Sequence, residues 1–508
     1  MKYILTIILS GLLCFAVNSA DGQDESLSRL SQRLTNYIDR PSVKPIVSTS
    51  QTIEQLSKAN FVDLGKFWKK IELNGAPFVE RCNDLNYLLV TFLYRNDASD
   101  INVSIDIKNG YIGDGKKDMS LIHISNTDVW YRTYKVPSDW TTSYRFVVTE
   151  NANKNKFTKN IAKSEVKIVA KSEVKIAAKN HTMSDIKSYT NNHTKSATQN
   201  GISKDLEKNR DSSNSRVVDD RYNKNRIPDG IVSEETYNVF DYFHDSSKGW
   251  FYVKSNIKKG TLESFQFESK ILNNTRNIMV YKPTGYTDSD CEKTDMQKYP
   301  TIIIFDQSLY MNRIPVHVIL DNLIAAKKIP PCVAILVDNQ PTERREFELP
   351  LYEPFADFVA LELMPWAYKN FKLIEDPNKT IIAGVSYGGL ASSYIALKYP
   401  NLFGNVLSQS GSYWRGKKVT DSIPWLQVQY NSSAKLPIRF YMDCGLQETV
   451  MRSFSNFNFI ENHRKMRDIL KSKGYEVYYQ EFQGGHEWSG WRKTLPDGLI
   501  ILLNQINQ

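Results

Sequence analysis

From Asn277 onward, short apolar runs alternate with helical stretches. Parallel strands need long crossover connections, usually helices, so this alternation predicts an α/β layer domain with a mainly parallel sheet. We assign this domain to residues 237–508. Strands are expected at 277–283, 301–306, 332–338, 380–386, 405–411, 438–445 and 475–482, with helices at 355–371 and 388–399.

A different pattern of residues precedes this domain. Short β-branched and aromatic runs, parted by Gly, Asn, Asp and Pro turns, are typical of a small all-β sandwich. We assign that domain to residues 55–150 and interpret the polar residues 21–54 as a leader. The runs lie at 86–95, 101–107, 129–136 and 143–148.

Residues 151–236 are rich in Lys, Asn, Ser and Thr and contain "AKSEVKI" twice. Two copies of a short unit cannot bury a shared face, so we expect a flexible insert. A polycationic tether to an anionic envelope surface is the alternative.

The insert also accounts for most of the net charge of the chain: residues 151–230 hold 17 Lys+Arg and 9 Asp+Glu, a balance of +8 out of the chain's +9. A basic nucleic-acid-binding face is therefore not expected.

Residues 1–20 have the form of a secretory signal peptide: Lys2, an apolar run over 3–17, then small residues. That run is short for a membrane helix, which needs about 20 apolar residues, and no later segment approaches this length. We expect a periplasmic or secreted protein without a membrane span.

The cysteines are too few and too scattered for a disulfide scaffold or a metal cluster. Cys14 would leave with the signal peptide. We expect the others to be buried thiols, with one disulfide as the alternative. They are Cys82, Cys291, Cys332 and Cys444.

The segment "GVSYGG" (384–389) stands between the strand at 380 and the helix at 388. A serine on such a tight strand-to-helix turn exposes its Oγ, while the glycines allow neighbouring backbone to pass closely. Ser386 is therefore a candidate nucleophile. The alternative is a glycine-rich turn with an incidental serine.

Only two histidines follow Ser386 in the chain. His463 lies in a helical pattern, where a solvated helix face is the ordinary explanation, whereas His486 lies in a glycine-rich turn after the last strand. His486 is the candidate base. The acid should follow the strand at 438–445, which leaves Glu448, our preference, or Asp443.

An oxyanion hole would need backbone N–H groups near the nucleophile. We expect one from Tyr387 and a second from the loop after the strand at 301, around Gln307 and Ser308.

These residues resemble the enterochelin (enterobactin) esterase family of the α/β-hydrolase superfamily. The likeness rests on "GVSYGGL", "LSQSGSYW" (407–414), "GGH" followed by "WR" at 491–492, an R-x-x-E-L element at 345–349 and "NTDVWYRTYKVPSDW" near the N-terminus. It implies an α/β hydrolase catalytic domain with an N-terminal all-β sandwich domain.

The resemblance further implies a serine esterase acting on a catecholate siderophore built on a tri-serine lactone. Ser386 would be the nucleophile and His486 the base, with Glu448 or Asp443 orienting the imidazole. No cofactor or metal is expected, and iron would enter only as part of a chelated substrate. Residues that would line the substrate side are Arg345, Trp414, Trp491 and Arg492.

Two other interpretations stay open. One is a general exported serine carboxylesterase that acts on acetylated or feruloylated sugars or other small esters, since a fold does not determine its substrate. The other is a non-catalytic siderophore or envelope binding protein, which the combination of Ser386, His486 and an acid disfavours.

Overall fold

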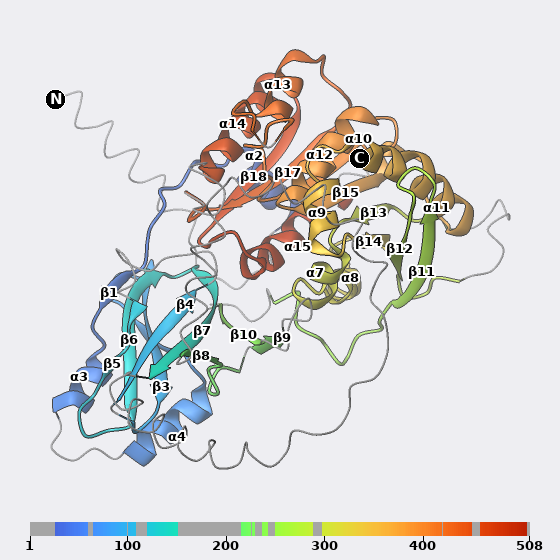
Figure 1. The fold of residues 1–508 in the computed structure, drawn as a ribbon. Coiled ribbons are helices and arrows are strands. Elements are labelled where there is room, and N and C mark those ends of the chain that lie inside the picture. The colour runs from blue at the N-terminus through green and yellow to red at the C-terminus, as the bar shows by residue number, and fades with distance from the viewer. Residues whose placement is uncertain are drawn as a thin grey trace, which may run out of the picture.

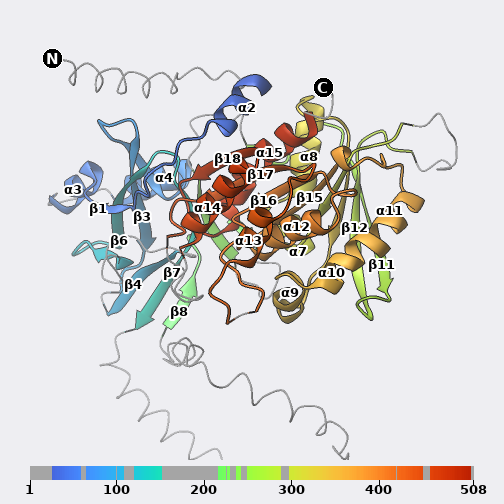
Figure 2. The same cartoon turned by 90° about the horizontal axis from the view of Figure 1, so that it is seen from above.

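The structure, a computed structural model, contains an α/β half and a β half that lie next to each other (Figures 1 and 2). The expected signal peptide, Cys291 and most of the expected insert lie outside the described residues. The described residues are 26–58, 64–98, 100–107, 119–150, 215–224, 226–228, 236–241, 249–287, 297–418, 420–449 and 458–504.

One eight-stranded sheet forms the α/β half, in the order β11-β12-β14-β13-β15-β16-β17-β18. β12 pairs antiparallel with β11 and β14, and the other neighbours are parallel. The strands are β11 (Thr261–Ser269), β12 (Asn274–Lys282), β13 (Thr301–Ile304), β14 (Val333–Val337), β15 (Thr380–Val385), β16 (Asn405–Gln409), β17 (Arg439–Gly445) and β18 (Glu476–Phe482).

Seven of these strands overlap the seven that the sequence predicts. The edge strand β11 was not predicted, because exposed and half-buried residues alternate along it and it contains no continuous apolar run. The central strands β13 to β16 are buried along their whole length, as a sheet covered on both faces requires.

Helices cover both faces of the sheet. Because side chains alternate along a strand, Ile303 of β13 joins one hydrophobic cluster, while Ile302 and Ile304 join another on the opposite face. The first cluster takes side chains from α10 (Glu353–Asp357), the π-helical turn Phe358–Leu363, α11 (Met364–Asn370), α12 (Tyr387–Lys398), α13 (Trp425–Ser432) and α14 (Phe459–Ser472). The second takes them from α2 (Leu27–Thr35), α7 (Gln307–Asn312), α8 (Val316–Ala325) and α15 (Trp488–Asn504).

The β half consists of two antiparallel sheets whose strands contribute to one hydrophobic cluster. The first contains β1 (Ile46–Ser48), β6 (Val129–Pro137), β3 (Tyr87–Arg95) and β2 (Phe78–Arg81), with β5 (Ile122–His123) paired to β6. The second contains β4 (Ile101–Ile107), β7 (Thr141–Glu150), β10 (Thr236–Asp241) and β9 (Arg226–Pro228), with β8 (Ser215–Val218) paired to β7.

The β half extends beyond the boundary at residue 150 that the sequence suggested. β8 and β10 both pair with β7, and β9 pairs with β10, so the described residues 215–224, 226–228 and 236–241 belong to this half rather than to a flexible insert or to the α/β domain. Their short, polar runs do not by themselves predict strands. Buried contacts hold this segment: the Tyr144 hydroxyl donates to Asp220 (2.6 Å), and Asn223 Nδ2 donates to Tyr144 Oη (2.9 Å).

The segment interpreted as a polar leader also has regular structure. Leu27, Leu30 and Leu34 fall on one face of α2, and Leu30 and Leu34 are buried in the cluster shared with α15. Further on, Ile46–Ser48 forms β1 of the β half. This segment therefore contacts both halves. The other helices near the N-terminus are α3 (Gln51–Lys58) and α4 (Leu64–Asn74).

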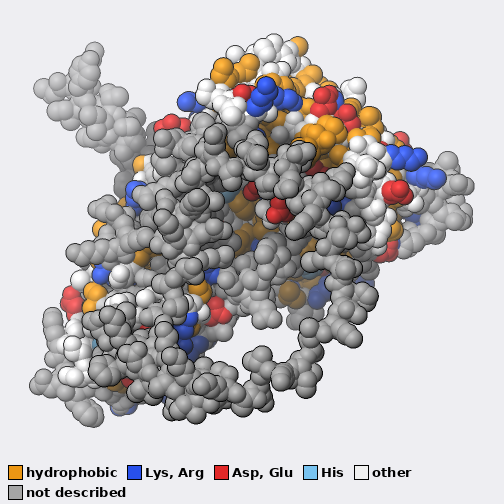
Figure 3. Space-filling model, in the orientation of Figure 1, with side chains coloured by type: hydrophobic (Ala, Val, Ile, Leu, Met, Phe, Trp, Pro, Cys, Tyr) orange, Lys and Arg blue, Asp and Glu red, His pale blue; other side chains and the backbone are white. Residues whose placement is uncertain are grey.

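The surface charge of the α/β half is mixed. On the face that Figure 3 shows, the described Lys and Arg side chains are interspersed with Asp and Glu. No helix formed by the described residues is long and apolar enough to cross a membrane.

Deleting residues 215–228 should lower the Tm by more than about 5 °C, because it removes β8, β9 and the buried Asp220 and Asn223 contacts. The matched control deletes residues 160–210, whose Lys/Asn/Ser-rich composition offers little to a core, and should change the Tm by less than about 2 °C. Calorimetry of both deletion variants measures the difference. An equal effect of the two deletions would contradict the assignment of residues 215–228 to the β half.

Candidate active site

Ser386 occupies a sharp turn between β15 and α12, with φ 56° and ψ −118°. Positive φ is unusual for a non-glycine residue and is often found at functional sites. Two glycines permit the turn: a Cβ on Gly384 would lie 2.5 Å from the carbonyl carbon of Gly388. The side chain of Ser386 is half-buried at the carboxyl end of the sheet.

Three residues predicted from the sequence lie in hydrogen-bond contact. His486 Nε2 is 2.9 Å from Ser386 Oγ, and His486 Nδ1 is 2.7 Å from Glu448 Oε2. His486 lies in the turn between β18 and α15, and Glu448 follows β17, so the three side chains come from the ends of three parallel strands. This arrangement could transfer a proton from the serine to the imidazole.

Glu448 is buried, and its other oxygen is also bonded. Oε1 accepts from Ser410 Oγ (2.6 Å) and from the Gly445 backbone N–H (2.7 Å). Burial by itself would raise the pKa of Glu448, but the charge of His486 and hydrogen bonds from His486, Ser410 and Gly445 outweigh burial and hold the pKa below its usual value. The carboxylate is therefore ionised, as orientation of an imidazole requires.

Trp491 lies behind the acid rather than on an open substrate face. Its indole Nε1 donates to Ser410 Oγ (2.8 Å), which in turn donates to Glu448. Ser410 has φ 45° and was missed from the sequence, although its place directly after a buried strand, in "SQSGS", was the available signal. Trp491 and Ser410 thus hold the acid in place.

Asp443, the alternative acid, occupies a different position. It is buried in β17, and its Oδ2 accepts from Gln409 Nε2 (3.0 Å), while the imidazole contacts Glu448. Burial, with a smaller contribution from the Glu448 charge, raises the pKa of Asp443 to about 7. The geometry therefore favours Glu448 as the partner of His486.

Two helix N-termini lie next to Ser386. Tyr387 and Gln307 are the first residues of α12 and α7, where backbone N–H groups have no acceptor within the helix. Asp306, which precedes α7, has φ 60°, and its Oδ2 lies 3.5 Å from the position of a Cβ on Gly388. Tyr387 and Gln307 can therefore supply an oxyanion hole. The hydroxyl of Ser308 accepts from Asn312 Nδ2 (3.3 Å) on an exposed part of α7.

Arg345, expected on the substrate side, forms an ion pair. From α9 (Thr342–Glu348), its Nε and Nη2 donate to the two carboxylate oxygens of Asp306, each at 2.7 Å. The same helix provides Glu348, which binds the buried Arg276 at 2.7 Å. Asn339 Oδ1 accepts from the Asp306 backbone N–H (3.1 Å). The R-x-x-E-L element therefore anchors the loop that leads to Gln307.

Arg492 is also engaged inside the protein. It is 2% exposed and pairs with the buried Asp241 of β10, in the β half. Trp414 is 7% exposed; its ring lies 6.4 Å from that of Tyr387 and 5.8 Å from that of Phe459. Phe459, which the sequence did not single out, also contacts the imidazole of His486 edge to face at 4.7 Å.

His463 does not lie on a solvated helix face, and that expectation is wrong. It is buried on α14, with its ring 4.8 Å from that of Tyr413, and burial lowers the pKa of His463 to about 4. The neutral ring packs in the core, which its position in an otherwise polar helical sequence did not reveal.

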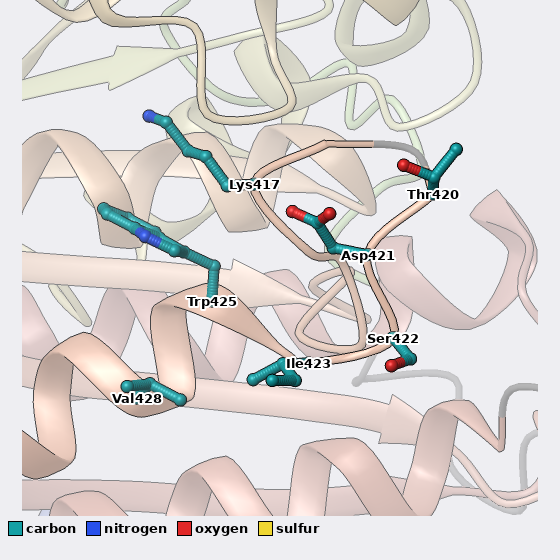
Figure 4. A pocket seen from close by; sticks show the side chains of 7 residues that line it. All are labelled: Lys417, Thr420, Asp421, Ser422, Ile423, Trp425 and Val428. Atoms are coloured by element: carbon teal, nitrogen blue, oxygen red, sulfur yellow. The ribbon is translucent and has the colours of Figure 1, made fainter.

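A separate open pocket of about 460 Å³ lies on the loop before α13 (Figure 4). Lys417 and Trp425 lie side by side there, with Nζ 4.7 Å from the ring. The pocket belongs to the loop and helix that follow β16, not to the turns that carry Ser386, Glu448 and His486. Its lining residues are Lys417, Thr420, Asp421, Ser422, Ile423, Trp425 and Val428.

Within the described part of the chain, no group of three His, Cys, Asp or Glu side chains is placed to hold a metal ion. The described cysteines are free thiols: Cys332 and Cys444 are buried, and Cys82 is half-buried.

Replacing Asp443 with Asn should change how stability depends on pH. With a folded pKa near 7 against an ordinary value of 3.8, Asp443 holds its proton in the folded state where the unfolded chain loses it. Stability from this group is therefore lost as pH rises from about 4 to about 7. Relative to Asp443→Asn, the wild-type free energy of unfolding should fall by about 4 kcal/mol between pH 4 and pH 8. Parallel pH profiles from urea unfolding would contradict this prediction.

Comparison with known proteins identifies two family domains in this chain. Residues 89–199 match the N-terminal domain of enterochelin esterases, and residues 269–502 match the sequence model of an esterase family. The two matches follow each other as the β half and the α/β half do.

Two curated relatives are iron(III) enterobactin esterases. The one from Dickeya dadantii (strain 3937) is 30% identical over 253 residues, covering 48% of this chain and 55% of the relative. The one from Escherichia coli O6:H1 (strain CFT073) is 29% identical over 238 residues, covering 46% and 56%. The chain thus spans about half the length of these curated relatives.

The fold is shared with solved structures. The crystal structure of the enterobactin esterase from Shigella flexneri in the presence of enterobactin matches with a TM-score of 0.61 and 21% identity, covering 88% of this chain and 100% of that chain. At this identity the match shows an esterase-type α/β fold. Both family models match in chain order, so this chain contains an esterase domain preceded by a region similar to the N-terminal domain of enterochelin esterases.

Proposed function

We propose that this protein is a serine carboxylic ester hydrolase that cleaves the ester bonds of a catecholate siderophore of the enterobactin type and so aids iron release. The observation that carries the proposal is the chain of contacts from Ser386 through His486 to Glu448, at 2.9 and 2.7 Å, on a strained strand-to-helix turn. The matches to the two family models support the ester substrate.

In the proposed reaction, Ser386 Oγ attacks the ester carbonyl while its proton passes to His486 Nε2. Glu448 stabilises the imidazolium through Nδ1. The N–H groups of Tyr387 and Gln307 stabilise the charge that develops on the carbonyl oxygen.

The tetrahedral intermediate then collapses. The serine hydroxyl of the substrate leaves with the proton from His486, and the acyl group stays on Ser386 as an ester. Water, deprotonated by His486, attacks this acyl-enzyme, and collapse of the resulting intermediate returns that proton to Ser386 and releases a carboxylic acid, which loses its remaining proton to solvent. No cofactor enters these steps; iron would be present only in a chelated substrate.

The relatives support a siderophore substrate. Two of them are iron(III) enterobactin esterases, and one solved structure was obtained in the presence of enterobactin. We propose that Tyr387 and Trp414, whose rings lie 6.4 Å apart beside the nucleophile, provide the aromatic contact for a catechol ring. The form of residues 1–20 leads us to propose that the protein acts in the periplasm or outside the cell.

One observation favours the second candidate, a general exported carboxylesterase for acetylated or feruloylated sugars or other small esters. Arg345 and Arg492, which were expected to meet an anionic substrate, are engaged in ion pairs with Asp306 and Asp241. The positive charge that would favour a ferric tris-catecholate is therefore partly neutralised inside the protein.

Turnover of three esters by the purified protein decides between these candidates. The macrocyclic catecholate tri-ester should be cleaved with kcat/KM at least about 100-fold above that for p-nitrophenyl acetate, because binding energy from its periphery can lower the barrier at the reacting ester. A feruloylated sugar is the third substrate. Brisk hydrolysis of that sugar without cleavage of the tri-ester would reject the siderophore proposal and support the alternative.

Matched variants complete this experiment. Ser386→Ala should lower kcat by about 10⁴-fold or more and abolish labelling by a fluorophosphonate, and Glu448→Gln should cost about 10²-fold or more. Asp443→Asn is the control for Glu448→Gln and should keep kcat within about threefold of the wild type. Full activity of Ser386→Ala would reject the mechanism.

Arg345→Ala should lower kcat on the tri-ester and on p-nitrophenyl acetate alike, by about tenfold, because the loop carrying Gln307 loses its anchor. Arg344→Ala, on the same helix, is the matched control and should leave both rates unchanged. A loss confined to the tri-ester would instead return Arg345 to a substrate-binding role.

A further inference from the structure

The turn that carries His486 has no regular structure of its own. Residues 483–487 connect β18 to α15, so the position of the imidazole depends on contacts made by this turn. One neighbour is the acid loop, since the Gln447 backbone N–H donates to the carbonyl of Gly484 (3.0 Å). Another neighbour is the start of β7, in the β half.

The start of β7 is bonded to this turn at two points. The Thr141 backbone N–H donates to the Gln483 carbonyl (3.0 Å). The Ser143 backbone N–H donates to both carboxylate oxygens of Glu487 (3.0 and 3.1 Å), and the Ser143 hydroxyl donates to Glu487 Oε2. These two bonded residues of the turn, Gln483 and Glu487, flank His486.

These contacts are buried and close. Glu487 is 2% exposed and Ser143 is fully buried, so water does not replace the bonds when they are lost. The approach is tight as well: a Cβ on Gly484 would lie 3.3 Å from Thr141 Cγ2. The β half also reaches the acid loop, where Trp140 Nε1 donates to Gln447 Oε1 (3.5 Å).

We propose that the β half is a positioning element of the catalytic centre, and that Ser143 acts through Glu487 to hold the turn that carries His486. The inference rests on the proposed function. Ser143 and Glu487 are positioning residues, because they act on the imidazole through the backbone of the turn. A shift of about 1 Å in a catalytic group is enough to cost large factors in rate, so loss of this contact should lower kcat without changing substrate affinity.

The test uses the full chain with Glu487→Gln, Ser143→Ala and the double variant, assayed on p-nitrophenyl acetate and on the catecholate tri-ester at 25 °C. We expect kcat to fall about tenfold in Glu487→Gln and about threefold in Ser143→Ala, which keeps its backbone N–H, with KM within about twofold of the wild type. The double variant should lose no more than Glu487→Gln alone, because both changes break the same contact.

Asp139→Asn is the matched control. Asp139 lies between β6 and β7, two residues before Thr141. It pairs with Arg40 at an exposed site (3.1 Å), so its replacement should leave kcat unchanged. A second readout needs no hydrolysis: backbone amides of residues 483–487 should exchange hydrogen faster in Glu487→Gln than in the wild type.

The outcomes separate three roles. Lower Tm with unchanged kcat and unchanged exchange would mean that the contact only joins the two halves, and would overturn the proposal. Losses on the tri-ester alone, with p-nitrophenyl acetate spared, would assign the contact to substrate binding and overturn it too. If the wild type hydrolyses no ester, the proposed function fails. Faster hydrogen exchange of residues 483–487 in Glu487→Gln would then still support the proposal that this contact holds the turn, and unchanged exchange would overturn it.

Discussion

The buried carboxylate of Glu448 is the constraint on which the rest of the site depends. A charge removed from water must be fully hydrogen-bonded, or its burial is strongly unfavourable. Its donors are Ser410, Gly445 and His486, which follow or end β16, β17 and β18. Satisfying this one group therefore requires three neighbouring parallel strands in register, and the same arrangement brings His486 to Ser386.

Each part of the site is supported by a contact from a distant segment. Trp491 supports Ser410, and through it the acid. Arg345 anchors Asp306, which precedes the helix that begins at Gln307. Ser143 contacts the residue after His486 from the β half. The contacts that hold the candidate site are thus distributed over both halves, as expected where backbone strain at Ser386 must be maintained by its surroundings.

Much of the α/β half could be predicted from the sequence, because hydrophobic periodicity is a local signal. Apolar runs located seven of the strands, and the glycines around Ser386 identified the turn. Short polar strands such as β8 carry no such signal, since their stability comes from pairing with β7 rather than from their own apolar residues. The helix α2 was missed for a different reason: its three leucines are isolated among polar residues in the sequence, and they come together on one face only once the segment is helical.

The sequence by itself determined seven strands of the α/β half, the tight turn at Ser386 and the choice of His486, since chain order and local residue types suffice for these. Only the tertiary structure decided that the imidazole meets Glu448 rather than Asp443, and that Arg345, Trp491 and Arg492 are engaged in internal contacts. The physical reason is that a charged or aromatic side chain acts through its partners. Those partners lie from about 40 to more than 200 residues away along the chain, where no local pattern records them.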